Sequence, residues 1–276
     1  MMNIENIKKE LAKFKRFTFY EEPHIYTFKA NPQDEEKEIS TSVTSLVHSY
    51  TNPFDAEKIA PLVARKEGVP KEVILSRWDF KRELACDKGT AIHAYMEWRF
   101  GKYGDYSYDK NFIIEKYGYD PIEPLWDKIK SVGEKFYQDY KDRLIPIGLE
   151  LVLGSIDYDL AGCIDFLAYS KKLDAIIILD YKSNDKIKFE DESRGKKMLY
   201  PLHHIPDTNY YHYCLQLAIY KHLLEHETNL KVLNKKWLIY INEKYDNYKL
   251  YECLDLSKEA KMILDLRRKK INGCVG

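Results

Sequence analysis

The 276-residue sequence has little of what marks a secreted, membrane-spanning or metal-cluster protein. Its five cysteines are an odd number, widely scattered and without a CxxC pair, so we expect reduced thiols and neither a zinc knuckle nor an iron–sulfur cluster. The longest apolar run, Ala175 to Leu179, is far shorter than the ~20 residues that span a bilayer. The amino terminus has no signal-peptide pattern, and we therefore expect a cytoplasmic protein without a membrane partner.

Net charge is also absent, because 44 acidic and 44 basic side chains balance. Any surface for a polyanionic partner must then be a local patch. Candidate patches are the group Arg77, Lys81 and Arg82, the stretch from Lys186 to Lys197, and the basic run from Arg267 to Lys270. For each patch the alternative of an ordinary solvated face stays open.

What the sequence does contain suits one elaborated domain. Hydrophobic residues make up 45% of the chain, which is enough for a packed interior and argues against a disordered chain. We predict a single domain over residues 1–276 of the α/β (α+β) class, with a mixed central sheet flanked by helices. Residues 1–85 are predicted to form a hairpin and helical elaboration, and residues 86–276 the core.

Periodicity and turn residues place the expected elements. Helices are predicted at Asn3 to Phe14, from Val43, from Asp55, from Lys71, from an N-cap at Thr90 to about Phe100, and at Leu125 to Leu144, Tyr210 to Glu227 and Ser257 to Lys270. A hairpin is predicted at Phe17 to Phe28, and strands at Leu149 to Leu153, Leu160 to Tyr169, Ala175 to Lys182, Trp237 to Asn242 and Tyr248 to Leu254. Irregular segments are expected at Asn31 to Glu38, Gly101 to Pro124 and Ser183 to Asn209.

Two carboxylates are predicted to meet on neighbouring strands. If Ser170 and Ala175 close a four-residue hairpin loop, Asp165 faces Asp180 across the strands. Cross-strand Cβ atoms lie roughly 5 Å apart, and like charges at that distance destabilise a sheet unless something offsets them. Strand alternation places Lys182 on the same face as Asp180. This set of oxygen ligands suits Mg²⁺ or Mn²⁺, and the lysine would orient or deprotonate a water.

A pair of surface acids beside a lysine is the ordinary alternative. The run Ile176 to Leu179 leads into Asp180 without alternation, which indicates a strand buried on both faces rather than one with a solvated side. A charged pair at the end of such a strand favours a functional role.

Four short motifs in this order resemble those of the PD-(D/E)XK nuclease superfamily in its RecB-like branch. They are Gly89-Thr90-Ala91-Ile92-His93, Gly162-Cys163-Ile164-Asp165, Asp180-Tyr181-Lys182 and Gln216-Leu217-Ala218-Ile219-Tyr220. Ser42 to Ser45 and Trp78 are more loosely similar to the region before the first motif in the mitochondrial genome maintenance exonuclease and its phage and large-DNA-virus relatives. The stretch from Pro201 to Pro206 favours a phage or viral origin, which would place the protein in a host cytoplasm.

The resemblance implies a restriction-endonuclease-like fold and a metal-dependent DNA nuclease. It implies one or two Mg²⁺ or Mn²⁺ ions, and its metal ligands fall at His93, Asp165, Asp180 and the Tyr181 carbonyl. Lys182 matches the catalytic lysine. Glu150 matches an acidic residue that binds metal or supports its ligands, and Glu97, one helical turn after His93, would orient the His93 ring.

Other positions are assigned less directly. Gln216 is expected on the site side of its helix as a catalytic residue. Tyr213 and Tyr220 share its face and are candidates for binding DNA, with core packing as the alternative. Arg77, Lys81, Arg82 and Lys88 would contact DNA, with tyrosines stacking on bases. The cysteine pattern excludes the iron–sulfur branch of these nucleases, and no helicase motif is present.

The sequence leaves the substrate open between several possibilities. We expect an exonuclease that acts on single strands or free ends of DNA and leaves 5′-phosphate and 3′-hydroxyl ends. A non-cutting nucleic-acid-binding or host-interfering protein on the same fold and a nuclease for RNA are the alternatives.

Overall fold

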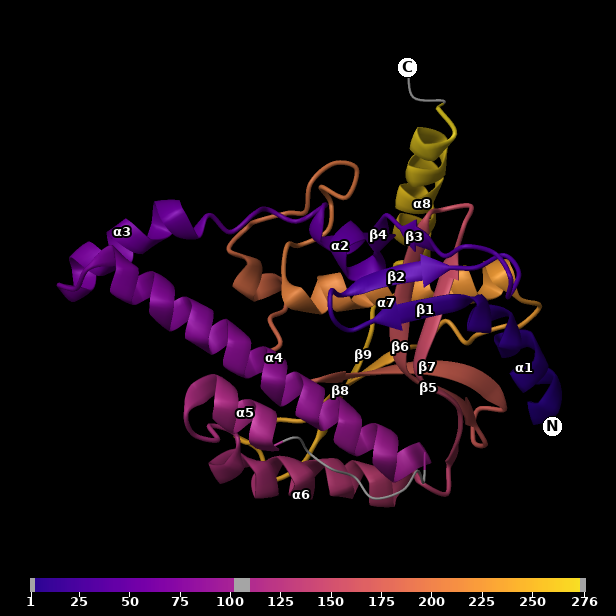
Figure 1. The fold of residues 1–276 in the computed structure, drawn as a ribbon, viewed down its shortest axis with the longest axis horizontal. Helices are drawn as coiled ribbons and strands as arrows, with labels where there is room; N and C mark the ends of the chain where they lie inside the picture. Colours follow the sequence, from indigo (N-terminus) through magenta and orange to yellow (C-terminus); the bar gives the residue numbers. More distant parts are fainter. Residues whose placement is uncertain (1–2, 102–109, 274–276) are drawn as a thin grey trace.

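The computed structural model describes residues 3–101 and 110–273 and contains a mixed sheet with helices on both faces (Figure 1). This confirms the predicted fold class. The first elements are α1 (Ile4–Leu11), the 3-10 helix η1 (Ala12–Arg16), β1 (Phe17–Tyr20), β2 (Ile25–Phe28), β3 (Lys37–Ile39), β4 (Thr41–Ser42), α2 (Val43–His48), α3 (Ala56–Glu67) and α4 (Lys71–Gly101). They are followed by α5 (Lys110–Tyr117), α6 (Glu123–Tyr140), β5 (Leu144–Ser155), β6 (Leu160–Ser170), β7 (Ala175–Lys182), the 3-10 helix η2 (Glu190–Ser193), α7 (Asn209–Glu227), β8 (Trp237–Tyr240), β9 (Lys249–Glu252) and α8 (Ser257–Ile271).

The larger sheet has the strand order β4-β6-β7-β8-β9, and β5 pairs with β6. Strands β5, β6 and β7 form an antiparallel meander, whereas β7 and β8 run parallel. The pairing of β6 with β7 includes Ser170 with Ala175 and Phe166 with Leu179, which is the predicted register. The four-residue loop therefore sets the alignment that brings Asp165 and Asp180 to the same end of the hairpin.

Two apolar layers hold the sheet between helices. One layer packs α7 and α8 against the sheet through residues such as Ile178, and the other packs α4 and α6 through residues such as Leu179. Strand β7 is buried on both faces, as its unbroken apolar run predicted. Among the described helices, none combines the length and the apolar character that crossing a bilayer requires.

The amino-terminal third adds a small sheet and a helical arm. Strands β1 and β2 pair as the predicted hairpin, and β3 extends it within the segment that was expected to be irregular. Helix α3 and the first half of α4 form a helical hairpin that projects from the body of the molecule (Figure 1). A small apolar cluster of Ala60, Ala64 and Ile74 joins them.

Several predicted boundaries are wrong. Thr90 is not an N-cap, because α4 runs unbroken through Gly89 and Thr90, and the expected division at residue 85 falls inside this helix. Helix α5 occupies part of the segment from Gly101 to Pro124. Helix α6 ends at Tyr140, and β5 begins at Leu144, five residues before the predicted start at Leu149. Packing against the sheet explains the first error, since it offsets the low helix propensity of a glycine.

Candidate metal centre

The candidate site lies where two strands separate. Strand β6 pairs with β7 only as far as Phe166 and Leu179, and its first residues pair instead with β4. From Leu179 onward, β7 pairs with β8. Asp165 and Asp180 are the residues immediately beyond the last β6–β7 pair, so both buried carboxylates lie at the fork in the sheet.

Three side chains at this fork could hold a metal ion. His93 comes from α4, Glu150 from β5 and Asp165 from β6, and one potential ligand atom from each lies within 4.8 Å of the others. Nδ1 of His93 is 3.2 Å from Oε1 of Glu150, and Nε2 of His93 is 3.6 Å from Oδ2 of Asp165. One imidazole and two carboxylates form a ligand set that a divalent cation accepts.

Backbone conformation orients two of these ligands. The backbone N–H of Tyr181 donates to Oδ2 of Asp165 at 2.8 Å, which fixes the carboxylate against the neighbouring strand. Glu150 has a φ of +42°, in the left-handed region, and the pairing of β5 with β6 shifts nearby between Pro146 and Gly148. The irregular strand carries Glu150 to the ring of His93.

The environment of His93 is strongly acidic. Burial by itself lowers the pKa of this ring, but the charges of Asp165 and Glu150 outweigh burial and raise the pKa to about 9. Besides Glu150, the ring faces the Tyr181 carbonyl oxygen, which is 3.3 Å from Nε2. His93, Tyr181 and the two acids thus converge on one position. Glu97 was expected to orient the ring, but among the described residues the carboxylate that contacts Nδ1 of His93 belongs to Glu150.

Asp180 and Lys182 form an ion pair beside this group. Nζ of Lys182 lies 2.5 Å from Oδ2 of Asp180, which confirms that both side chains project from the same face of β7. The Asp180 side chain is almost fully buried, and burial together with the charge of Asp165 raises its pKa. Burial lowers the pKa of Lys182, but Asp180 and Asp165 more than offset this and raise it above its ordinary value, so the ammonium is kept charged.

Asp180 therefore stands apart from the three-residue group in this arrangement, although the sequence suggested it as a ligand. Tyr181 points the other way, as predicted, and its ring packs on Phe166 and Phe136 in the α4–α6 layer. Its carbonyl oxygen lies near Nε2 of His93, and its buried ring also makes an edge contact with the His93 ring, at 5.8 Å between centroids.

Helix α7 lies next to the ion pair of Asp180 and Lys182. The Lys182 ammonium lies 4.7 Å from the ring centroid of Tyr213. Nε2 of Gln216 donates to the hydroxyl of Tyr220 at 3.0 Å and to Oγ1 of Thr44 at 3.3 Å. Tyr220 is buried against Gly162 and belongs to the core, which favours the packing role that the sequence left open.

The basic residues proposed to contact DNA are differently placed. Arg77 pairs with Glu67 at 3.0 Å and Arg82 with Asp79 at 3.1 Å, both on the exposed arm. Lys81 is exposed on the same helix.

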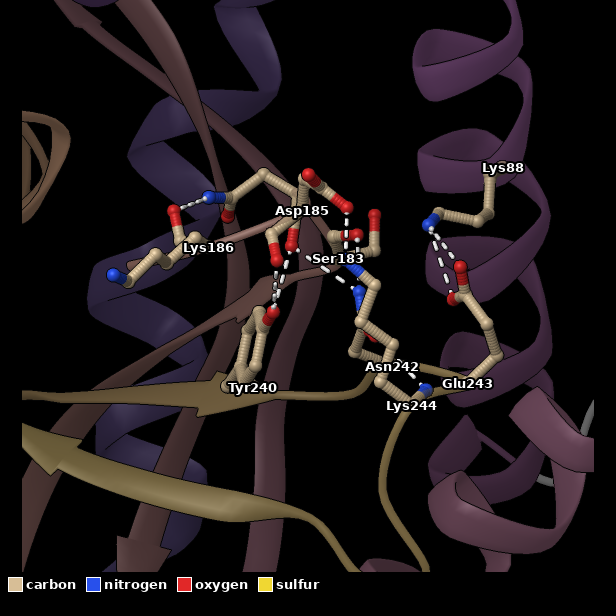
Figure 2. Close-up of polar contacts among 9 residues, drawn as sticks. Lys88, Ser183, Asp185, Lys186, Tyr240, Asn242, Glu243 and Lys244 are labelled. Atoms are coloured by element: carbon tan, nitrogen blue, oxygen red, sulfur yellow. Dashed lines mark hydrogen bonds and ion pairs between the residues drawn. The ribbon is translucent and has the colours of Figure 1, made fainter. Parts of the chain in front are cut away.

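Lys88 is mostly buried and pairs with Glu243 at 3.1 Å, which ties α4 to the segment after β8 (Figure 2). In the same view, Asn242 and Tyr240 hold the backbone that follows Lys182 by donating to carbonyl oxygens of residues 183–185. Lys88 is thus engaged in a structural contact.

Cys163 is a residue at the site that the sequence reasoning overlooked. Its thiol donates to Oε2 of Glu150 at 3.5 Å. Strand alternation was the available signal, because Cys163 stands two residues before Asp165 and so shares its face.

No protein-family model and no curated protein matches this chain. Among solved structures, one described as the crystal structure of SSO0001 is similar at 17% identity and a TM-score of 0.26, over 59% of this chain and 69% of that chain. A likeness of that strength carries no argument about fold or function.

Proposed function

We propose that the protein is a metal-dependent DNA nuclease of the RecB-like kind, acting on single strands or free ends. The observation that carries the proposal is the convergence of His93, Glu150 and Asp165 at the sheet fork, beside the ion pair of Asp180 and Lys182. Hydrolysis of a phosphodiester needs groups that offset negative charge and place a water, and this constellation has both kinds.

The side chains fit a Mg²⁺ or Mn²⁺ ion. The donor set is one imidazole with hard oxygen ligands, while Oδ2 of Asp180 is engaged by Nζ of Lys182 at 2.5 Å. A bound ion would supply Lewis-acid charge stabilisation and activate a water. Ligand roles at His93, Glu150 and Asp165 are supported by proximity, while those of Asp180 and the Tyr181 carbonyl depend on the motif resemblance.

The chain's own residues would position the substrate. The Lys182 ammonium, kept charged by Asp180 and Asp165, is suited to donate a hydrogen bond to a phosphate oxygen or to orient the water. Asp165 is held by a backbone N–H and so presents its other oxygen in a fixed direction. Gln216 donates to Tyr220 and Thr44, and a role for it at the substrate depends on the motif resemblance.

The first test is cleavage of end-labelled single-stranded, duplex and circular DNA in Mn²⁺ or Mg²⁺. We expect degradation of linear single strands, abolished by a chelator. Asp165→Asn and Lys182→Ala should each reduce the rate by about 10²-fold or more, because each removes a group that acts on developing charge.

The same cleavage assay, run with a control variant and with RNA, distinguishes the DNA nuclease from a binding protein and from an RNA nuclease. Asp127→Asn, which removes a carboxylate from a side chain that is 97% exposed, is the matched control and should cleave at the unaltered rate. Binding of DNA without any metal-dependent cleavage would contradict the proposal and favour a binding protein. Faster cleavage of an RNA strand of equal sequence would assign the activity to RNA.

A further inference from the structure

Two cavities adjoin each other on the surface over β5, next to the candidate metal centre. One, of about 470 Å³, is lined by α1, η1, Phe17 and β5, and includes Glu150 in its wall. The other, of about 330 Å³, is lined by Glu97 and the end of α4. Both are bordered by Lys8, Ile147 and Leu149, so they form one groove, which we call the β5 groove. The smaller cavity brings Lys8 of α1 next to Glu97 at the carboxyl-terminal end of α4.

Two cations, Lys8 and Lys15, line the β5 groove. Lys8 lines both cavities and Lys15 lines the larger one, and both side chains belong to exposed residues. Within residues 3–101 and 110–273, neither ammonium forms an ion pair, in contrast to Arg77, Arg82 and Lys88. A cation that is not already paired keeps its full capacity to bind an anion.

Part of the groove wall is apolar, and the wall contains one of the three candidate metal ligands. Leu11, Phe14, Leu149 and Leu151 contribute to its wall, and Glu150 belongs both to the wall and to the group that could hold a metal. Volumes of this size accept ligands of small-molecule size, comparable to single nucleotide units rather than to a duplex. Apolar surface beside spaced cations is the combination that binds a nucleic-acid strand by its bases and its phosphates.

We propose that the β5 groove binds the single DNA strand on one side of the scissile phosphate, with Lys8 and Lys15 contacting its backbone. This inference rests on the proposed function for the identity of the strand. In this proposal the main phosphate contacts come from α1 and η1, and not from Arg77, Lys81 and Arg82 on the first half of α4.

The test measures binding of a fluorescein-labelled single-stranded oligothymidylate to the full chain by fluorescence anisotropy, in a chelator so that no strand is consumed. The double variant K8A/K15A should bind about tenfold more weakly at ~0.1 M salt. The slope of log affinity against log salt should also fall, by about 0.7 for each lost phosphate contact. Both residues are exposed, so the variant is expected to fold, and thermal unfolding verifies this.

The matched control is K9A/K13A, which removes two exposed charges from the same segment outside this groove. Unchanged affinity in the control with weaker binding in K8A/K15A supports the proposal. Equal loss in both variants, no loss in either, or no binding by the unaltered protein overturns it. Strand binding that depends on Lys8 and Lys15, in a protein without metal-dependent cleavage, keeps the groove and contradicts the nuclease. If both double variants cleave DNA and bind the strand as well as the unaltered protein does, the nuclease proposal is kept and the groove proposal is contradicted.

Discussion

Gly162 stands three residues before Asp165 on β6, and the ring of Tyr220 occupies the place of its missing side chain. A Cβ built at this position would lie 2.6 Å from Cε1 of Tyr220 and 3.1 Å from Cγ2 of Val43. Both neighbours are buried in the layer between the sheet and α7. Glycine at this position therefore permits the close approach of the helix that carries Gln216.

We expect Gly162→Ala to lower the free energy of unfolding by about 1–3 kcal/mol, because a buried ring cannot move away from the added methyl group without disturbing its neighbours. Urea denaturation measures the change. Gly89→Ala is the comparison variant, since the nearest atom to its Cβ is Oγ of Ser183 at 3.8 Å and the residue lies inside α4. There we expect a gain of about 0.5–1 kcal/mol. A stability of Gly162→Ala equal to or above that of the unaltered protein would contradict the packing argument.

At the scale of secondary-structure elements, an ion pair between Lys88 and Glu243 ties α4 to the segment after β8. Lys88 and Glu243 have side chains only 12% and 19% exposed, so water screens their attraction weakly. The pair lies beside the residues 183–185 that follow Lys182 (Figure 2). It links the helix that carries His93 to the strand pair that supports Lys182.

We expect Lys88→Met to reduce the free energy of unfolding by about 1–3 kcal/mol, because it leaves Glu243 partly buried without its partner. Glu243→Gln should recover part of this loss in the double variant, and the resulting double-mutant cycle measures the coupling. Strand binding should change little in Lys88→Met. A large loss of DNA affinity with unaltered stability would return Lys88 to the role that the sequence suggested.

The β6–β7 hairpin and its two acids were accessible from sequence because local rules determine them. A four-residue loop sets the register, and alternation then places Lys182 beside Asp180. The partner of His93 was not accessible, because Glu150 reaches the ring through an irregular strand with a left-handed backbone. The ion pairs of Arg77 and Lys88 depend on residues 10 and 155 positions away, respectively, and no local pattern indicates them.

At the scale of the whole molecule, the candidate metal ligands come from three different secondary-structure elements. His93 lies on α4, Glu150 on β5 and Asp165 on β6, so a bound ion would link a helix to two strands of the sheet. An ion that binds only the folded chain stabilises it by mass action.

We expect Mn²⁺ at about 100 times its dissociation constant to stabilise the protein by about 2.7 kcal/mol, a rise in Tm of roughly 5 °C or more. Asp165→Asn should lose most of this rise. Asp127→Asn, which removes a carboxylate from a side chain that is 97% exposed, should keep it. Differential scanning fluorimetry with and without Mn²⁺ makes the measurement. An equal rise in both variants would place the ion elsewhere.

At Glu150 the left-handed backbone disfavours folding, while the side chain serves the proposed metal centre. A side chain in that conformation costs about 1 kcal/mol relative to glycine, which adopts it freely. Glycine at position 150 would remove this backbone strain and would also remove a carboxylate from the candidate metal centre. Selection for thermal stability alone would therefore favour glycine at position 150. Selection for the proposed activity would instead keep glutamate there, in spite of its unfavourable backbone conformation.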